Sequence, residues 1–233
     1  MTTLARFVSD LFKAAEWETQ LDWKGLVREL REAVDATDRE VGVVWRRNSA
    51  RQKWKRGDEA EVYLTATSAA ETTFHTHPRS LYPDSAYHPP TGFDVRCFVC
   101  KCARFPGEPV APDYIVEKAG VWCLRALTRG ARTEAEKQLK PSGTGEPLID
   151  QGRGADLLEA FQENANNEGR DLLDGKRTLD QYVDRMRTLV ADDMGVVITF
   201  APWERAGGTF SAARKRVSEN SKKRLKRRKT SRH

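Results

Sequence analysis

The segment 71–104, ETTFHTHPRSLYPDSAYHPPTGFDVRCFVCKCAR, constrains the fold more than any other part of the chain. Its first seven residues suit a strand, and Pro78 then ends the ladder pairing. Residues 94–104 place apolar side chains on one helical face. Side chains two apart on a strand point to the same side, so His75 and His77 can converge on one point. We therefore expect a strand, a loop and a helix that bring two imidazoles together.

Two imidazoles on one strand face are a natural pair of ligands for a borderline metal such as zinc. A third ligand is needed, and Asp94 lies at the start of the following helix. Two neutral histidines and one carboxylate leave a fourth position open for water, as catalytic zinc sites do. The segment thus predicts a Zn²⁺ site made of His75, His77 and Asp94.

The periodicity elsewhere predicts a mixture of helices and strands. Two amphipathic helices are expected in the first forty residues, the second beginning after Asp22 as its N-cap. Residues 48–60 are predicted to form a polar, turn-rich link, and residues 113–127 a hairpin that turns at 118–120. Thr178 is predicted to cap one of two C-terminal helices. Further strands are expected at 41–45, 61–67 and 195–203, and the other C-terminal helix carries Leu157, Leu158 and Phe161.

Charge is divided unevenly along the chain. The formal charge is +6, but residues 214–233 hold eleven Lys/Arg and one acid, so the remaining 213 residues hold 29 bases and 33 acids. The basicity therefore belongs to a tail, which we expect to be disordered and to bind nucleic acid or another acidic partner in a salt-dependent way. A merely solvated tail is the alternative. The stretch KKRLKRRK also fits the composition of a nuclear localisation signal.

The sequence predicts a soluble, intracellular protein. No run of 18 apolar residues is present, so we expect neither a membrane span nor a signal peptide. The four cysteines are too few and too clustered for a secreted disulfide framework, which favours a reducing compartment. We interpret them as buried apolar side chains, with a structural zinc site at C-x-x-C-x-C as the alternative. They are Cys97, Cys100, Cys102 and Cys123.

The stretch HTHP followed by PPTGFD resembles the JAMM signature of MPN-domain metalloproteases, in which H-x-H-P, a loop and S-x-x-D supply the zinc ligands. That family takes a glutamate from an earlier strand, in an E-x-G-G context after a helix, and DREVGVVW offers Glu40 there. A helix that begins at the aspartate and a following hairpin are also similar. The resemblance covers roughly residues 20–127. It implies an α+β, α/β/α-like fold with the cytidine-deaminase-like mixed sheet flanked by helices, here with a helical C-terminal addition and a basic tail.

The resemblance also implies a role for each site residue. His75, His77 and Asp94 would bind zinc, and Glu40 would act as general base toward a metal-activated water and return the proton to the leaving amine. Thr91, at the family's serine position, would donate its hydroxyl to the oxyanion. The implied protein is a zinc-dependent, deubiquitinase-like metallohydrolase that cleaves a peptide or isopeptide bond in a ubiquitin-like or other protein substrate.

Three features depart from the family pattern. Thr91 carries a methyl group that serine lacks, which restricts its rotamers. Thirteen residues separate His77 from Thr91, so the loop must bulge out, and its Tyr82 and Tyr87 can form a lid or a partner surface. Val43 replaces the second glycine of E-x-G-G.

Several site residues permit another interpretation. Thr91-x-x-Asp94 is close to a helix capping box, which needs no chemistry. Glu71 competes with Glu40 as the catalytic acid, but it lies about 13 Å along the strand from the first histidine of the pair. His88 is a spare ligand candidate that we expect to be exposed to solvent, because prolines flank it in a loop.

Four parts are expected along the chain, and they allow more than one function. A noncatalytic MPN-like scaffold is the alternative to the enzyme; it resembles JAMM-like products of large DNA viruses, in which the tail would tether a virion protein to nucleic acid. A nucleic-acid-binding protein would explain the tail and ignore the body. Deleting the tail separates the cases, because the body should still bind metal in the first two. The parts are N-terminal helices (1–37), a metal-binding core (38–130), a helical addition with a returning strand (131–213) and the basic tail (214–233).

Overall fold

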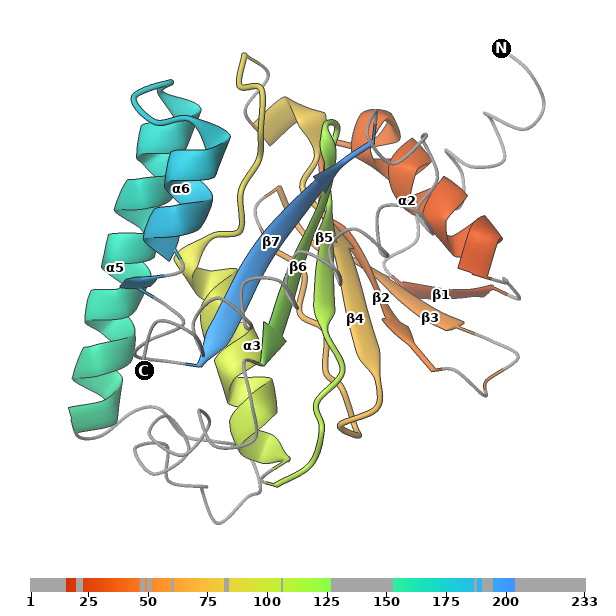
Figure 1. The fold of residues 1–233 in the computed structure, drawn as a ribbon. Helices are drawn as coiled ribbons and strands as arrows, with labels where there is room; N and C mark the ends of the chain where they lie inside the picture. Colours follow the sequence, from red (N-terminus) through yellow and green to blue (C-terminus); the bar gives the residue numbers. More distant parts are fainter. Residues whose placement is uncertain are drawn as a thin grey trace.

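A seven-stranded sheet forms the centre of the computed structural model (Figure 1). Its strands are β1 (Glu16–Thr19), β2 (Val41–Trp45), β3 (Gln52–Arg56), β4 (Thr72–Thr76), β5 (Asp113–Val116), β6 (Gly120–Ala126) and β7 (Val196–Pro202). They lie in the order β1-β3-β2-β4-β5-β6-β7. β4 and β5 run parallel, and the other neighbouring strands are antiparallel. The structure describes residues 16–19, 23–46, 49, 52–59, 61–81, 84–105, 107–126, 153–186, 188–189 and 195–203.

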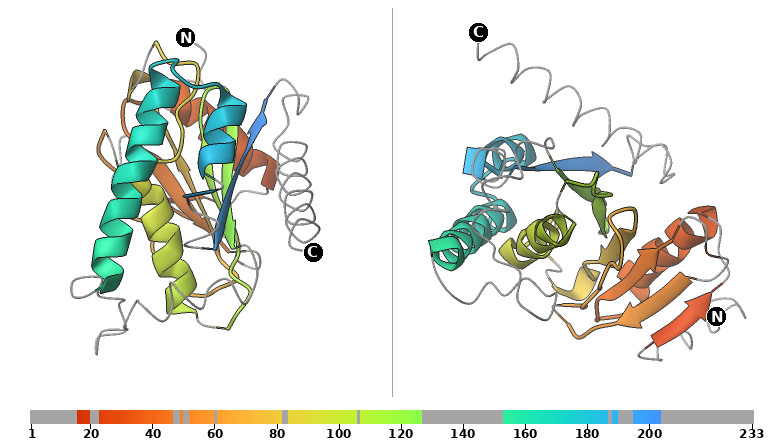
Figure 2. Two further views of the ribbon diagram at one scale, coloured as in Figure 1. Left: turned by 60° about the vertical axis from the view of Figure 1, so that its left-hand side comes forward. Right: turned by 90° about the horizontal axis from the view of Figure 1, so that it is seen from below.

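Helices lie on both sides of this sheet. α2 (Trp23–Ala36) covers one face, whereas α3 (Gly92–Arg104) and α6 (Leu179–Met186) lie on the other, with α5 (Arg153–Leu173) packed against both (Figure 2). A single 3₁₀ turn, η1 (Arg79–Leu81), follows β4. The arrangement confirms the expected α+β class, a mixed sheet flanked by helices.

Each face of the sheet has its own hydrophobic core, because strand side chains alternate between faces. Tyr114 of β5 belongs to the core against α2, and the next residue, Ile115, belongs to the core against α3. Phe74 of β4 lies in the core against α2. The side chain of His75 therefore projects toward α3, on the face that also receives the start of that helix.

Several expected elements are confirmed. The helix after Asp22 is α2, and the hairpin at 113–127 is formed by β5 and β6. Thr178 caps α6 through two reciprocal hydrogen bonds: the backbone N–H of Thr178 donates to Gln181 Oε1 (2.8 Å), and the Gln181 N–H donates to Thr178 Oγ1 (3.3 Å). The last expected strand is β7, which pairs with β6 over its whole length.

Two expectations in the N-terminal half are wrong. Residues 16–19, expected to be helical, form β1, and residues 52–56, expected to lie in a polar link, form β3. In β3 the side chains of Gln52 and Trp54 are buried while Lys53 is exposed, which is the two-residue alternation of a strand. The segment therefore forms a strand despite its polar composition, because Trp54 and Gln52 are buried.

Residues 61–67 were expected to form a strand, but they form none. β3 already occupies the position beside β2, and the segment packs across the face of the sheet instead. A Cβ atom at Gly42 of β2 would lie 2.7 Å from Leu64 Cδ1 and 3.0 Å from a methyl group of Val62. Gly42 therefore permits this close approach.

The C-terminal helices hold the start of α3 in place. A Cβ atom at Gly92 would lie 2.5 Å from the backbone oxygen of Gln162, so α3 meets α5 with almost no space between them. The backbone N–H of Gly92 also donates to Asn166 Oδ1 of α5 at 2.9 Å. Residues 153–173, part of the expected helical addition, thus fix the helix terminus that carries Asp94.

Some expectations fall outside the described residues. They concern the helix in residues 1–15, the basic tail at 214–233 and the side chains of Leu157, Leu158 and Phe161. Among the helices of the described ranges, none has the length and apolarity needed to cross a membrane.

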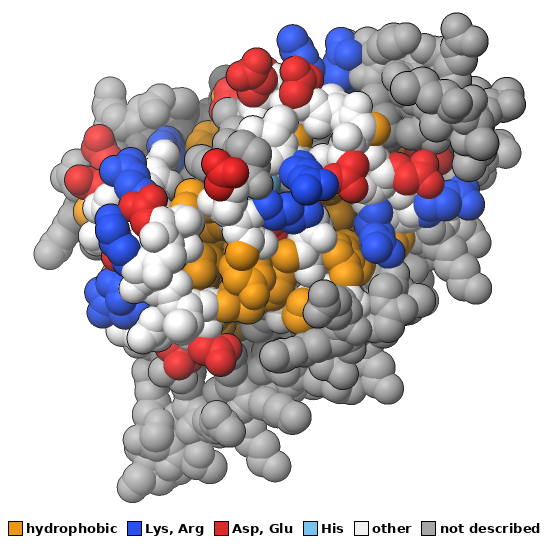
Figure 3. All heavy atoms as spheres, turned by 90° about the horizontal axis from the view of Figure 1, so that it is seen from above, with side chains coloured by type: hydrophobic (Ala, Val, Ile, Leu, Met, Phe, Trp, Pro, Cys, Tyr) orange, Lys and Arg blue, Asp and Glu red, His pale blue; other side chains and the backbone are white. Residues whose placement is uncertain are grey.

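On the face seen from above in Figure 3, hydrophobic side chains gather near the middle, and charged side chains of both signs surround them.

Candidate metal site

The two histidines lie at the carboxyl end of β4, beside the start of β2. Thr76, whose side chain faces away from them, accepts a hydrogen bond from the Val41 N–H at 3.0 Å. Glu40 directly precedes β2, and its backbone N–H and C=O pair with residues 57 and 58 at 2.8 Å each. These contacts hold the Glu40 side chain beside the histidine pair.

The ligand atoms of three predicted zinc ligands lie at metal-binding separations. His75 Nε2 lies 3.3 Å from His77 Nε2 and 3.1 Å from Asp94 Oδ1, and His77 Nε2 lies 3.5 Å from Asp94 Oδ2. Two donors held by one tetrahedral zinc, at bond lengths of about 2.0–2.1 Å, are about 3.3 Å apart. The chain therefore brings His75, His77 and Asp94 together, with a different Asp94 oxygen near each histidine, at separations similar to those between two ligands of one such ion.

Glu40 completes the cluster. Its Oε1 lies 3.6 Å from His77 Nε2, and ligand atoms of Glu40, His75 and His77 all lie within 4.8 Å of one another. Glu40 and His77 are buried, and His75 is half-buried. Among the residues described in the structure, no other group of three or more metal-ligand side chains comes together. This group can hold a metal ion, and its donors, imidazole nitrogen and carboxylate oxygen, are ones that zinc accepts.

The protonation of the metal-free cluster follows from burial and mutual charge. Burial raises the pKa of Glu40 to about 7, against the attraction of both histidines. Burial alone would lower the pKa of His77, but the hydrogen bond and charge of Asp94 and the charge of Glu40 raise it to about 9. Burial would raise the pKa of Asp94, whereas His75 and His77 hold it far below its usual range. In the metal-free cluster Asp94 is therefore ionised, whereas Glu40 gains or loses its proton near pH 7.

A second layer of hydrogen bonds orients His77. Its Nδ1 lies 3.2 Å from the carbonyl oxygen of His88; because a carbonyl only accepts, Nδ1 carries the proton. The backbone N–H of His88 donates to the Glu117 carboxylate, which also accepts from Trp122 Nε1 at 3.2 Å. Such partners fix the tautomer that leaves Nε2 free to bind a metal.

These second-layer residues were not found from the sequence. His88 was expected to be exposed, and this was wrong: it is fully buried, because its peptide group bridges His77 and Glu117. In the sequence, nothing distinguished Glu117 from the other residues of the hairpin that β5 and β6 form. The available signal was a carboxylate inside the apolar stretch YIVEKAGVW, where only a buried partner makes an acid tolerable.

Thr91 is the N-cap of α3, and the predicted capping box is confirmed. Asp94 N–H donates to Thr91 Oγ1 at 3.2 Å, and the Thr91 N–H donates to Asp94 Oδ2 at 2.6 Å. The Thr91 hydroxyl also donates to Asp94 Oδ2 at 2.9 Å. Thr91 thus orients one oxygen of Asp94, while the other faces His75. Its role as an oxyanion donor stays a prediction.

Two other candidates, Glu71 and Tyr87, lie outside the cluster. Glu71 accepts from Arg46 Nε at 2.7 Å and from the Thr67 N–H at 2.6 Å, so it anchors a turn at the far end of β4. Tyr87 packs edge-on against Phe200, with ring centroids 5.5 Å apart, and its part in a lid or a partner surface stays a prediction; Tyr82 lies outside the described residues.

The cysteines are free thiols and form no metal site among the described side chains. Cys102 and Cys123 are buried as expected. Cys97 is exposed and Cys100 half-buried, so the interpretation of buried apolar side chains is wrong for these two. They lie on the side of α3 that faces a cleft rather than the sheet.

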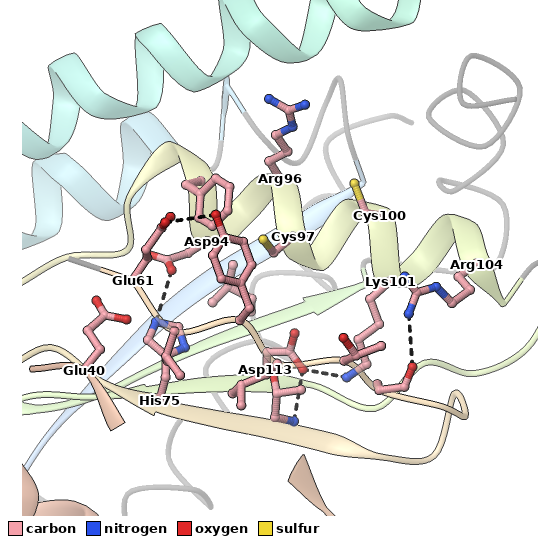
Figure 4. A pocket seen from close by; sticks show the side chains of 18 residues that line it. Glu40, Glu61, His75, Asp94, Arg96, Cys97, Cys100, Lys101, Arg104 and Asp113 are labelled. Carbon is pink, nitrogen blue, oxygen red and sulfur yellow. Dashed lines mark hydrogen bonds and ion pairs between the residues drawn. The ribbon is translucent and has the colours of Figure 1, made fainter. Parts of the chain in front are cut away.

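A cleft of about 320 Å³ leads away from the cluster, between the segment 61–66 and α3 (Figure 4). Glu40, His75 and Asp94 line one end. Lys101, Arg104 and Asp113 line the other end, with Cys97 and Cys100 between (Figure 4). The cluster is therefore reachable from this cleft.

No protein-family model, curated protein or solved structure matches the chain. The structure itself defines a mixed α+β protein with a buried group, Glu40, His75 and His77, that can bind a metal ion.

Removing the charge of Glu117 should loosen the site without removing a ligand. In Glu117→Gln the amide N–H₂ must face either the His88 N–H or the Trp122 N–H, so one donor loses its acceptor. We expect zinc affinity to fall about 10- to 100-fold, the usual effect of second-layer partners. A competition titration with a chromophoric chelator measures it. Glu108→Gln, on the exposed loop after α3, is the matched control, and unchanged zinc affinity in Glu117→Gln would contradict the assignment.

Metal binding and metal-free stability should respond to pH in opposite directions. The folded pKa of His77 is about 9, above the ordinary 6.5, and that of Glu40 is about 7, above 4.5. Both folded groups hold protons that the unfolded chain has lost, so metal-free stability should fall as pH rises from about 5 to 9. Zinc displaces the His77 proton, so its affinity should rise up to about tenfold per pH unit below pH 9. Chelator competition and thermal unfolding across this range measure both trends; parallel trends would contradict them.

Proposed function

We propose that the protein is a zinc-dependent metallohydrolase of JAMM type that cleaves a peptide or isopeptide bond. The observation that carries the proposal is the spacing of His75, His77 and Asp94, at 3.1 to 3.5 Å between ligand atoms, with a buried Glu40 beside them. Two histidines and one carboxylate are a donor set of catalytic zinc sites. Zinc, when bound, supplies Lewis-acid activation of water and of the scissile carbonyl.

Glu40 is the proposed general base. Burial raises its pKa to about 7, which places proton uptake and release near neutral pH. Its carboxylate takes a proton from the attacking water and passes it to the leaving amine, so the peptide C–N bond breaks as the new C–O bond forms. The backbone pairing of Glu40 with residues 57 and 58 keeps the carboxylate in position for both transfers.

The cleft is the proposed substrate site. Residues 62–65 make no backbone hydrogen bond to another backbone group of the described residues, although the neighbouring turns are hydrogen-bonded. An extended substrate lying between this segment and α3 would pair with these free groups and present its backbone to the metal cluster. The resemblance to MPN domains favours a ubiquitin-like conjugate as the substrate.

The order of elements supports the MPN part of the proposal. A helix, α2, precedes Glu40; β4 carries both histidines; α3 begins at the capping box of Asp94; and the β5–β6 hairpin follows. This is the order that the family resemblance implies. The helical addition then returns through β7 to the edge beside β6.

A noncatalytic MPN-like scaffold is the second candidate. The specific observation in its favour is the hydroxyl of Thr91, which donates to Asp94 and is not available to an oxyanion. In this case the basic tail would tether the protein to nucleic acid, in the cell or in a virion. A zinc-loaded protein that cleaves no substrate would favour this function.

Zinc content tests the first step of the proposal. Purified protein should carry about one zinc per chain, and Asp94→Ala should carry little. The zinc-loaded protein should then be incubated with isopeptide-linked dimers of ubiquitin-like proteins and analysed by mass spectrometry. A wild-type protein without metal affinity would overturn the proposal.

A further inference from the structure

The cleft contains three basic side chains, all from α3, and they differ in their partners. Lys101 Nζ lies 2.5 Å from Asp113 Oδ1 and donates to the Ala111 carbonyl at 3.1 Å, so its charge is compensated. Arg96 reaches Gln162 Oε1 of α5 at 3.5 Å. Arg104 donates from one terminal nitrogen to the Ala66 carbonyl at 3.2 Å. Among these three, Lys101 is the one with a carboxylate partner in the described chain.

Arg104 differs from the other two in having a buried nitrogen that finds no acceptor among the described residues. No carboxylate of the described residues lies within ion-pair distance of its guanidinium, and its Nε is buried without a hydrogen-bond acceptor. A partly buried charge without a counter-ion is costly, and a bound anion reduces that cost. The Ala66 carbonyl holds the guanidinium plane, which leaves terminal N–H groups for a ligand at the end of the cleft (Figure 4).

We propose that Arg104 is a specificity-determining residue, which binds a carboxylate of the substrate at the end of the cleft remote from the metal. The planar guanidinium offers paired donors that match the two oxygens of a carboxylate. Lys101 does not compete for this ligand, because Asp113 already neutralises it. The substrate class is therefore an extended polypeptide that carries an acidic residue or a free C-terminus at this point. The proposal rests on the proposed function of the metal cluster.

The helix sets the distance between the two ends of the site. Asp94 and Arg104 are ten residues apart on α3, which corresponds to about 15 Å along the helix axis. An extended chain covers about 3.3 Å per residue. The recognised carboxylate should accordingly lie about four or five residues from the bond that is cleaved.

A binding selection tests the subsite independently of hydrolysis. The full chain with Glu40→Gln, loaded with zinc, is panned against a random dodecapeptide library. We expect an acidic residue to be enriched at one position of the selected peptides. Replacing that acid by its amide should weaken binding about tenfold, the loss of one charge-assisted contact.

Variants of Arg104 test whether this residue causes the preference for acidic peptides. Arg104→Gln should remove the difference between the acidic and the amide peptide, and Arg104→Glu should favour a lysine peptide. Arg104→Lys keeps a donor for Ala66 and should keep part of the preference, which covers the case in which Arg104→Gln folds poorly. Arg28→Gln on α2 changes the net charge equally, lies outside the cleft lining and should leave the preference intact.

The outcomes separate the subsite from the hydrolase. Absence of acidic enrichment, or an acid preference that survives Arg104→Gln or is removed by Arg96→Gln, would overturn the subsite. Cleavage by the wild type without acid preference overturns the subsite and leaves the hydrolase. Arg104-dependent binding of acidic peptides that the zinc-loaded wild type never cleaves overturns the hydrolase and leaves the subsite.

Discussion

His75→Ala should reduce bound zinc from about one ion per chain to a background of about a tenth or less, because a tetrahedral site cannot lose one of three protein ligands and remain tight. The remaining His77 and Asp94 would still attract each other but could no longer enclose an ion. Metal analysis after extensive dialysis measures the loss. The side chain of His75 is 14% exposed and that of His77 is 2% exposed, so truncating His75 should disturb the fold less than truncating His77.

Two further variants make the result specific to the cluster. His77→Ala should also lose zinc, and it should destabilise the fold more, because it removes one partner of Asp94 and leaves the His88 carbonyl without its donor. His233→Asn, in the basic tail, is the matched histidine control: it is not one of the predicted ligands, so zinc should be retained. Full zinc content in His75→Ala would show that the ion binds elsewhere.

Glu40→Gln should abolish cleavage while zinc remains bound. The amide has the size of the carboxylate but accepts no proton, and loss of a positioned general base lowers turnover about 10²- to 10⁴-fold. The variant should fold at least as stably as the wild type, because the change removes a carboxylate whose ionisation burial opposes. Turnover of an isopeptide-linked dimer, zinc content and thermal unfolding together measure the effect.

Glu71→Gln is the matched control for this experiment. Glu71 competed with Glu40 in the sequence, but the structure ties it to Arg46 and Thr67. The control should therefore lose stability, by about 1–3 kcal/mol for a charged hydrogen bond, and keep its turnover. Turnover of Glu40→Gln within a few-fold of wild type would exclude Glu40 as the base, and loss of zinc would make it a ligand.

The central part of the site follows from local patterns in the sequence. Alternation on one strand predicts that His75 and His77 share a side, and a T-x-x-D capping box predicts that Asp94 lies in the first turn of a helix. Both are properties of neighbouring residues, and both are present in the structure. The meeting of strand and helix was expected from the resemblance.

The second layer depends on contacts between residues distant in sequence. His88 is buried because Glu117, 29 residues later, accepts from its N–H. β3 likewise depends on a contact distant in sequence. Its Trp54 is buried and lies opposite Val43 of β2. From the local sequence, His88 was expected in an exposed loop and β3 in a polar link. Only the complete fold supplies the partners that bury them.

The parallel pairing of β4 and β5 has a consequence for how the protein can vary. Parallel neighbours need a crossover connection, and here α3 forms part of it, so the sheet itself returns Asp94 to the end of β4. The backbone of His88 anchors His77, and Asp94 anchors Thr91, so residues 79–86 of the loop between them do not set the distance between the ligands. A longer or shorter segment in place of residues 79–86 can therefore change which substrates reach the site, while the positions of His75, His77 and Asp94 stay the same.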